Sequence, residues 1–140
     1  MIIKGKLIEC KREKRKFDKR ESEEKLWISL ADAVITDEQM AKIAKAFDEA
    51  GKKFTPDWVK DFKGYVNVST KYEVPFRDVE KVEYNDIEAA IKNGFKWMGA
   101  QVDLSIAIKE GAIYPRAMVF RTEGSALNAF SDFDEDEDAD

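Results

Sequence analysis

The run of residues 11–20 (KREKRKFDKR) concentrates the positive charge of this chain. It holds seven basic and two acidic side chains, a net charge of +5 over ten residues. Ammonium and guanidinium groups in such a run can pair with the phosphate oxygens of a nucleic acid and release its counterions. The basic members are Lys11, Arg12, Lys14, Arg15, Lys16, Lys19 and Arg20, and Phe17 lies among them. A charged loop that is simply solvated is the alternative interpretation.

Aromatic residues on the polar side of amphipathic segments form a second group of candidates. In residues 25–35 the apolar side chains alternate, and Trp27 faces away from them. In residues 64–72, Tyr65 faces away from the valines in the same way. Flat rings in such positions can receive bases by stacking, whatever the base. The candidates of this second group are these aromatic residues and the basic residues close to them in the sequence: Trp27, Tyr65, Lys71, Tyr72, Phe76, Arg77, Tyr114 and Arg116.

Two of these assignments have structural alternatives. Trp27 could instead pack beneath the helix expected after residue 36, whose apolar side must be buried somewhere. Tyr114 and Arg116 share the alternation of Met118 and Phe120, which would place them on an apolar side of their strand.

Several kinds of chemistry are excluded by composition. The chain has no histidine and a single cysteine, Cys10. Histidine-dependent catalysis and metal sites of the His or multi-Cys type are therefore absent. The sequence has no phosphate-binding or dinucleotide-binding glycine pattern, and its acids lack calcium-loop spacing. We expect a protein that is not an enzyme, with no catalytic residue, no metal and no cofactor.

Hydrophobic alternation predicts five strands that must position the candidates. The first two form a hairpin whose long connection is the basic run, either as arms that extend past the core or as a mobile loop. A tight turn at Glu110-Gly111 joins the last two. The five expected strands cover residues 2–10, 25–35, 64–72, 100–109 and 112–121.

Capping residues predict the helices. Thr36 and Gln39 form a capping box, and Gly51 ends the helix that follows. A second helix is predicted to start with Pro56 at its first helical position. A further short helix begins at Asn85 or Asp86 and stops at Gly94.

The two ends of the chain carry opposite charge. The last ten residues hold seven acids and no base, whereas the other 130 carry 22 acids and 24 bases. We interpret residues 1–121 as one domain with a helical insertion over 36–62, and residues 122–140 as a disordered acidic tail. The tail residues expected to contact partners are Phe130, Asp132, Phe133, Asp134, Glu135, Asp136, Glu137, Asp138 and Asp140.

Strand order and tail together resemble a known family. Five strands with a helix between the third and fourth are typical of an OB-fold, so the expected fold is mainly β, a five-stranded OB-fold-like barrel with inserted helices. Such a body, ending in acids that follow Phe130 and Phe133, resembles bacteriophage single-stranded DNA-binding proteins. The chain departs from that pattern in its helical insertion and in ending on Asp140 rather than near an aromatic residue.

The resemblance implies a function and partners. It implies sequence-independent coating of single-stranded DNA in replication, recombination and repair, and a tail that contacts replication or recombination proteins. By mimicking phosphates, the tail can also compete for the basic site, although solubility alone would explain its charge. A non-enzymatic adaptor or inhibitor whose tail mimics nucleic acid is the alternative function. The sequence leaves a homodimer open.

The location of the protein follows from what the sequence lacks. No apolar run reaches the roughly 20 residues that span a bilayer, and the start lacks the pattern of a signal peptide. We expect no membrane contact and a cytoplasmic location, in the bacterial host if the protein is phage-encoded.

Overall fold

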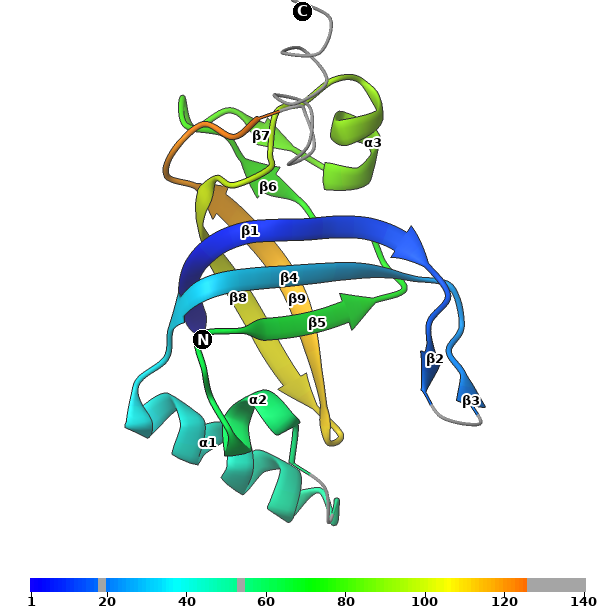
Figure 1. The fold of residues 1–140 in the computed structure, drawn as a ribbon, viewed down its shortest axis with the longest axis vertical. Helices are drawn as coiled ribbons and strands as arrows, with labels where there is room; N and C mark the ends of the chain where they lie inside the picture. The colour runs from blue at the N-terminus through cyan, green and yellow to red at the C-terminus, as the bar shows by residue number, and fades with distance from the viewer. Residues whose placement is uncertain (18–19, 53–54, 126–140) are drawn as a thin grey trace, which may run out of the picture.

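The computed structural model describes residues 1–17, 20–52 and 55–125, which form a mainly β fold with three helices (Figure 1). The helices are α1 (Asp37–Glu49), α2 (Asp57–Lys60) and α3 (Ile87–Lys92). In this part of the chain, no helix is long and apolar enough to cross a lipid bilayer. The strands are β1 (Ile2–Glu13), β2 (Lys16–Phe17), β3 (Arg20–Glu21), β4 (Lys25–Val34), β5 (Val66–Thr70), β6 (Phe76–Arg77), β7 (Glu83–Tyr84), β8 (Gln101–Lys109) and β9 (Ala112–Phe120).

Seven of these strands form one sheet in the order β5-β4-β1-β8-β9-β6-β7. Neighbours are antiparallel except for β6 and β9, which run parallel. β5 and β9 lie close together, but no ladder joins them among the described residues, so the sheet is open. The prediction of a five-stranded barrel is corrected accordingly. β6 and β7 have two residues each, too few for an alternating pattern to reveal them.

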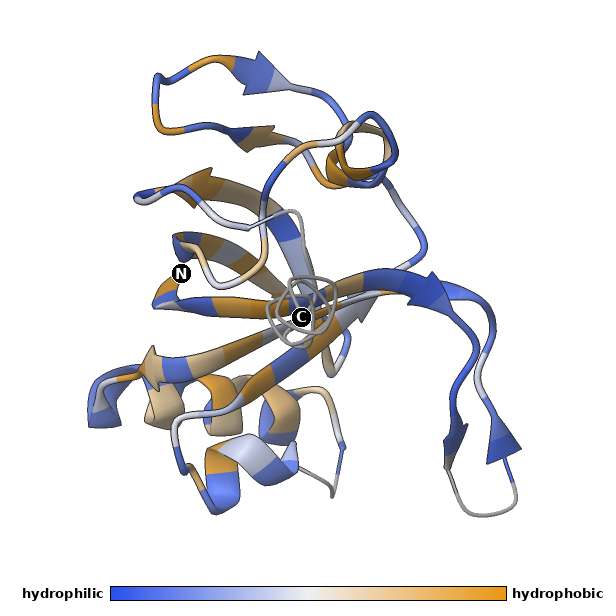
Figure 2. Ribbon diagram, turned by 45° about the horizontal axis from the view of Figure 1, so that its top comes forward, coloured by the Kyte–Doolittle hydropathy of each residue, from blue (hydrophilic) through white to orange (hydrophobic). Residues whose placement is uncertain are grey.

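The basic run extends the sheet and then leaves it. Its first three residues continue β1 as far as Glu13, which pairs with Lys25 of β4. β2 and β3 pair with each other and project from the ends of β1 and β4, which matches the prediction of arms extending past the core (Figure 1). We call β2, β3 and the adjoining described residues 14–15 and 22–24 the ribbon, which is mainly hydrophilic (Figure 2).

The predicted alternation of β4 builds the core. Leu26, Ile28 and Leu30 are fully buried, and Ile43 and Phe47 of α1 pack in the same cluster. Burial of apolar surface contributes about 25 cal/mol per Å², so these side chains hold α1 against the sheet. Because Leu26, Ile28 and Leu30 face the core, the alternate side chains of β4 face away from it.

The helix ends follow the predicted capping signals. The Gln39 N–H donates to Thr36 Oγ1 at 3.1 Å, and the Thr36 N–H donates to the Gln39 side chain at 3.0 Å. Asp86 caps α3 by accepting the Glu88 N–H at 3.1 Å. Pro56 precedes α2 rather than being its first residue. α1 and α3 therefore begin where their local sequence directs.

Three bulges decide which way side chains face, and the first lies in β1 between Leu7 and Glu9. In β4, an extra residue between Ala31 and Val34 places Asp32 at φ 51°. In β9, Ala117 pairs with Ser105 and Pro115 with Ile106, so Arg116 is the extra residue. The bulge shifts the alternation by one position, because two residues oppose one. Consequently Tyr114 and Arg116 are exposed while Met118 and Phe120 are buried, and the prediction that all four share one side is wrong.

The residues that follow β9 pack against the rest of the fold. Met98 and Ser125 form a bridge with N–H···O distances of 2.9 and 2.8 Å, and the Gln101 N–H donates to Thr122 Oγ1 at 2.8 Å. Residues 122–125, assigned to the tail from sequence, are thus bound to the body. Residues 126–140, with the predicted partner-binding positions from Phe130 to Asp140, lie outside the described residues.

Candidate nucleic-acid interface

The outward side of β1, β4 and β5, which we call the outer face, centres on Trp27. Trp27 lies opposite Lys11 of β1 and Ser69 of β5, and faces away from Leu26 and Ile28. It is only 8% exposed, yet it lies outside the hydrophobic core cluster. The indole N–H donates to the Glu13 carbonyl at 3.0 Å, which fixes the ring against the end of β1.

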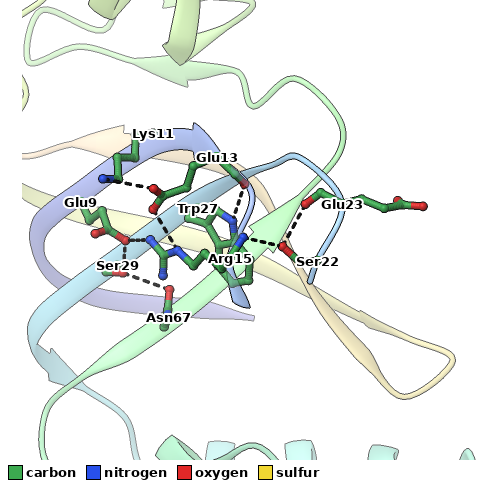
Figure 3. Close-up of polar contacts among 9 residues, drawn as sticks. All are labelled: Glu9, Lys11, Glu13, Arg15, Ser22, Glu23, Trp27, Ser29 and Asn67. Carbon is green, nitrogen blue, oxygen red and sulfur yellow. Dashed lines mark hydrogen bonds and ion pairs between the residues drawn. The ribbon is translucent and has the colours of Figure 1, made fainter. Parts of the chain in front are cut away.

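Arg15 lies over the Trp27 ring (Figure 3). Its guanidinium carbon is 4.3 Å from the ring centroid, within the range of a cation–π interaction. Its Nε donates to Glu13 Oε1 at 3.0 Å, and its Nη2 donates to Glu9. Two carboxylates on β1 therefore hold this guanidinium in place above the indole.

Neighbouring charges complete this cluster. Lys11 Nζ lies 3.2 Å from Glu13 Oε2. Burial raises the pKa of the Glu13 carboxyl, but hydrogen bonds and attraction from Lys11 and Arg15 outweigh it and hold that pKa below its ordinary value. Two cations and the carboxylates of Glu9 and Glu13 thus leave the centre of the outer face without net charge.

A polar row crosses the outer face beside this cluster (Figure 3). Ser29 Oγ lies 3.0 Å from Asn67 Oδ1 and 3.3 Å from Glu9 Oε1. Because the hydroxyl has one hydrogen, these two acceptors share it. The row joins β1, β4 and β5 and makes this part of the outer face polar.

Arg15 also anchors the ribbon. Its N–H donates to Ser22 Oγ at 2.8 Å, and the Ser22 N–H donates to the Arg15 carbonyl at 2.7 Å. Three predicted cations, Lys14, Lys16 and Arg20, are exposed on the ribbon. Lys19 lies outside the described residues, and Phe17 belongs to β2.

Exposed tyrosines lie at both ends of β5, the outermost strand of the sheet, and near the start of β9: Tyr65 precedes β5, Tyr72 follows it and Tyr114 belongs to β9. Tyr65 is 59% exposed, Tyr72 77% and Tyr114 38%. The bond to Glu23 raises the pKa of Lys71, and the phenols of Tyr72 and Tyr114 add to that shift, which places both near the ammonium. We call Tyr65, Lys71, Tyr72, Tyr114 and Arg116 the tyrosine edge.

The ribbon and the tyrosine edge are linked across β4. Lys71 forms an ion pair with Glu23, at the base of the ribbon, and this pair lowers the pKa of Glu23. The ribbon and the tyrosine edge thus form two borders of the outer face that carry exposed cations, and these borders meet at the Lys71–Glu23 ion pair.

Three predicted site residues lie elsewhere. Phe76 is 2% exposed, and its ring centroid is 4.8 Å from that of Tyr84 and 4.7 Å from that of Phe95, so it has no free ring face for a base. Arg77 pairs with Glu83 at 2.7 Å on the β6–β7 hairpin. Arg12 is half-buried and pairs with Glu88 of α3 at 2.8 Å. These three therefore lie away from the outer face.

The chain was compared with known proteins. No protein-family model matches the sequence, and no curated protein matches it. The structure is similar to two solved structures of the single-stranded DNA-binding protein from bacteriophage Enc34. The structure in complex with ssDNA has a TM-score of 0.45 and 15% identity, covering 89% of this chain and 88% of that chain. The other has a TM-score of 0.43 and 16% identity, covering 94% of this chain and 89% of that chain.

Both similarities, at 15% and 16% identity, are likenesses of fold alone. They concern the course of the backbone, and the side chains described above are those of this chain alone. Within the described residues, no group of His, Cys, Asp and Glu is placed to hold a metal ion.

Sequence reasoning overlooked the acidic half of the interface. Glu9 binds Arg15, Glu13 binds Lys11, and Glu23 binds Lys71. In the sequence these acids count only as negative charges that lower the net charge. Strand parity would have placed Glu9, Lys11 and Glu13 on the core side with Ile3 and Leu7. The bulge between Leu7 and Glu9 turns them to the side that Trp27 occupies on β4, and the sequence gives no signal of it.

Proposed function

We propose that this protein binds single-stranded DNA, without sequence preference, on the outer face of β4 and β5 between the ribbon and the tyrosine edge. One observation carries the proposal. Exposed rings on the tyrosine edge and exposed cations on both borders adjoin the same outer face. Stacking rings combined with cations that follow phosphates are what binding to single strands requires.

The two kinds of group would have separate tasks. Lys14, Lys16 and Arg20 on the ribbon, with Arg116 on the tyrosine edge, would contact phosphates and make affinity fall with salt. Tyr65, Tyr72 and Tyr114 would stack on bases, and stacking accepts every base because every base has a π-face.

We propose an OB-type arrangement as the basis of this site. The five long strands follow one another in the sheet as the third, second, first, fourth and fifth of that set. The ribbon then corresponds to the loop between the first two strands, and the Glu110-Gly111 turn to the loop between the last two. In OB-folds these two loops flank the binding face formed by the second and third strands.

The acidic tail would regulate the same site. We propose that its carboxylates compete with DNA for the cationic borders, and that bound DNA makes the tail available to replication proteins. The experiment compares the full chain with one ending at Ser125. Tighter DNA binding at low salt by the shortened chain supports competition, and unchanged or weaker binding contradicts it. A full-length control with the tail acids changed to amides separates the effect of charge from that of length.

The test of binding itself is a titration of the full chain with labelled oligo-dT, followed by fluorescence anisotropy over a range of salt. Saturable binding with a negative log–log salt slope supports the proposal. Absence of binding at low salt contradicts it and favours the adaptor function. Oligo-dA of equal length is the control for sequence preference.

A further inference from the structure

We propose that the guanidinium of Arg15, and not the Trp27 ring beneath it, is the surface on which one base stacks. This inference deepens the proposed function and rests on it. Trp27 is the aromatic residue nearest the middle of the outer face, but at 8% exposure it offers a base almost no ring surface. The group that covers its ring is itself flat and one-fifth exposed.

The contacts of Arg15 leave its plane as the free route of approach. Arg15 Nε donates to Glu13 and Nη2 donates to Glu9, so both carboxylates bind at the edge of the guanidinium plane. The indole lies under one side, 4.3 Å from the guanidinium carbon. Among the described residues, this guanidinium makes no further hydrogen bond, ion pair or ring contact. Arginine planes are established stacking partners for unpaired bases.

The charge of the cluster favours a base over a phosphate at this point. Arg15 and Lys11 are balanced by Glu9 and Glu13, all within direct contact. A phosphate would have to compete with two carboxylates, whereas an uncharged base would not. The strand would therefore place its phosphates over Lys14, Lys16 and Arg20 and turn a base inward onto Arg15.

The platform is already formed in the free protein. Trp27 is fixed by its bond to the Glu13 carbonyl, and the main chain of Arg15 is fixed by Ser22. A side chain that is held before binding loses less conformational freedom when a base arrives. Lysine at position 15 would keep the charge but would have no plane.

The experiment uses Arg15→Lys in the full chain, with Arg121→Lys as the matched control. Arg121 is likewise held by a carboxylate, at Asp103, and lies beyond the end of β9. Each variant is titrated with oligo-dT and with an abasic strand of the same length. The ratio of the two affinities isolates base stacking from phosphate contact. Thermal unfolding checks that both variants are folded.

We expect Arg15→Lys to lower the oligo-dT affinity about fivefold or more. The affinity for the abasic strand and the salt slope should stay unchanged, and so should every value for Arg121→Lys. An unchanged oligo-dT to abasic ratio overturns the inference. Tighter oligo-dT binding also overturns it, because Arg15 would then be a cover that hides Trp27.

A second variant keeps the inference testable if Arg15→Lys does not fold. Glu13→Gln retains Arg15 but weakens its hold, and it removes a negative charge from the outer face. We expect the ratio of oligo-dT to abasic affinity to fall even if phosphate attraction rises. A ratio equal to that of the unmodified chain overturns the inference. Failure of the unmodified chain to bind oligo-dT would instead overturn the proposed function.

Discussion

Trp27 is buried although it lies on the outer side of the sheet. Its strand position makes it face away from the core, and Arg15 covers its ring from the solvent side. Tyr72 is the opposite case, 77% exposed at the end of β5. For single residues, the direction of a side chain and its accessibility are separate properties, and only accessibility decides whether a ring can bind a ligand.

Tyr72→Ala tests this distinction at the residue scale. We expect an affinity for oligo-dT lower by about fivefold or more, because a stacking ring contributes about 1–3 kcal/mol per base. The free energy of unfolding should change by less than about 0.5 kcal/mol, since the side chain is on the surface. Anisotropy titration and urea unfolding measure the two quantities. Val82→Ala, exposed on the β6–β7 hairpin, is the control, and an equal loss there would contradict the prediction.

Within the elements, irregularities matter as much as regular pairing. The bulge at Arg116 turns Tyr114 outward and Met118 inward within one strand, which brings Tyr114 to the tyrosine edge. The bulge at Asp32 bends β4 beside Gly64, whose carbonyl accepts the Ala33 N–H at 2.8 Å. Each bulge re-aims a strand that the alternating pattern alone would continue unchanged.

Asp32→Val tests the strain at the β4 bulge. The left-handed φ of 51° costs a β-branched residue about 1–2 kcal/mol, so urea unfolding should show a loss of that order. Asp32→Gly should unfold at the same or slightly higher urea concentration, because glycine adopts positive φ freely. Equal stability of the valine and glycine variants would show that this conformation is not required.

The double change Lys14→Ala and Lys16→Ala tests the ribbon as an element. Each phosphate contact to a single strand contributes about 0.7 to the log–log salt slope, so the slope should become shallower by about 1.4. Lys42→Ala with Lys45→Ala on α1 removes the same charge from a surface remote from the ribbon. If both pairs alter the slope equally, net charge rather than the ribbon governs affinity.

For the whole molecule, the core joins β1, β4, β5, β8, β9 and α1 into one unit. Cys10 lies within it at 5% exposure. Burial, followed by the nearby carboxylates of Glu88, Asp86 and Glu9, raises the pKa of its thiol to about 12. Its reactivity therefore reports on opening of the whole core.

A thiol reagent at pH 8 tests this prediction. Native protein should react slowly, because almost no thiolate is present below a pKa of about 12 and the sulfur is covered. Protein unfolded in urea should react at the rate of a free cysteine, and the native rate should stay far below it while rising steadily with pH toward that pKa, as the thiolate fraction does. Rapid reaction of the native chain would show that β1 opens without global unfolding.

Local patterns predicted much of the fold. The capping box at Thr36 and Gln39, the cap at Asp86 and the alternation around Ile28 depend on residues a few positions apart, so the sequence contains the whole signal. The two-residue strands β6 and β7 were missed, because their hydrogen bonds come from tertiary packing and not from a periodic pattern.

The sequence alone determined the opposite charges of the two ends, the absence of histidine chemistry and the outward direction of Trp27 and Tyr65. Only the tertiary structure decided which of those groups are accessible. It set Arg15 on Trp27, joined Lys71 to Glu23, and buried Phe76. The physical reason is that strand direction follows from a period of two, whereas ion pairs and ring contacts depend on distances between segments far apart in the chain.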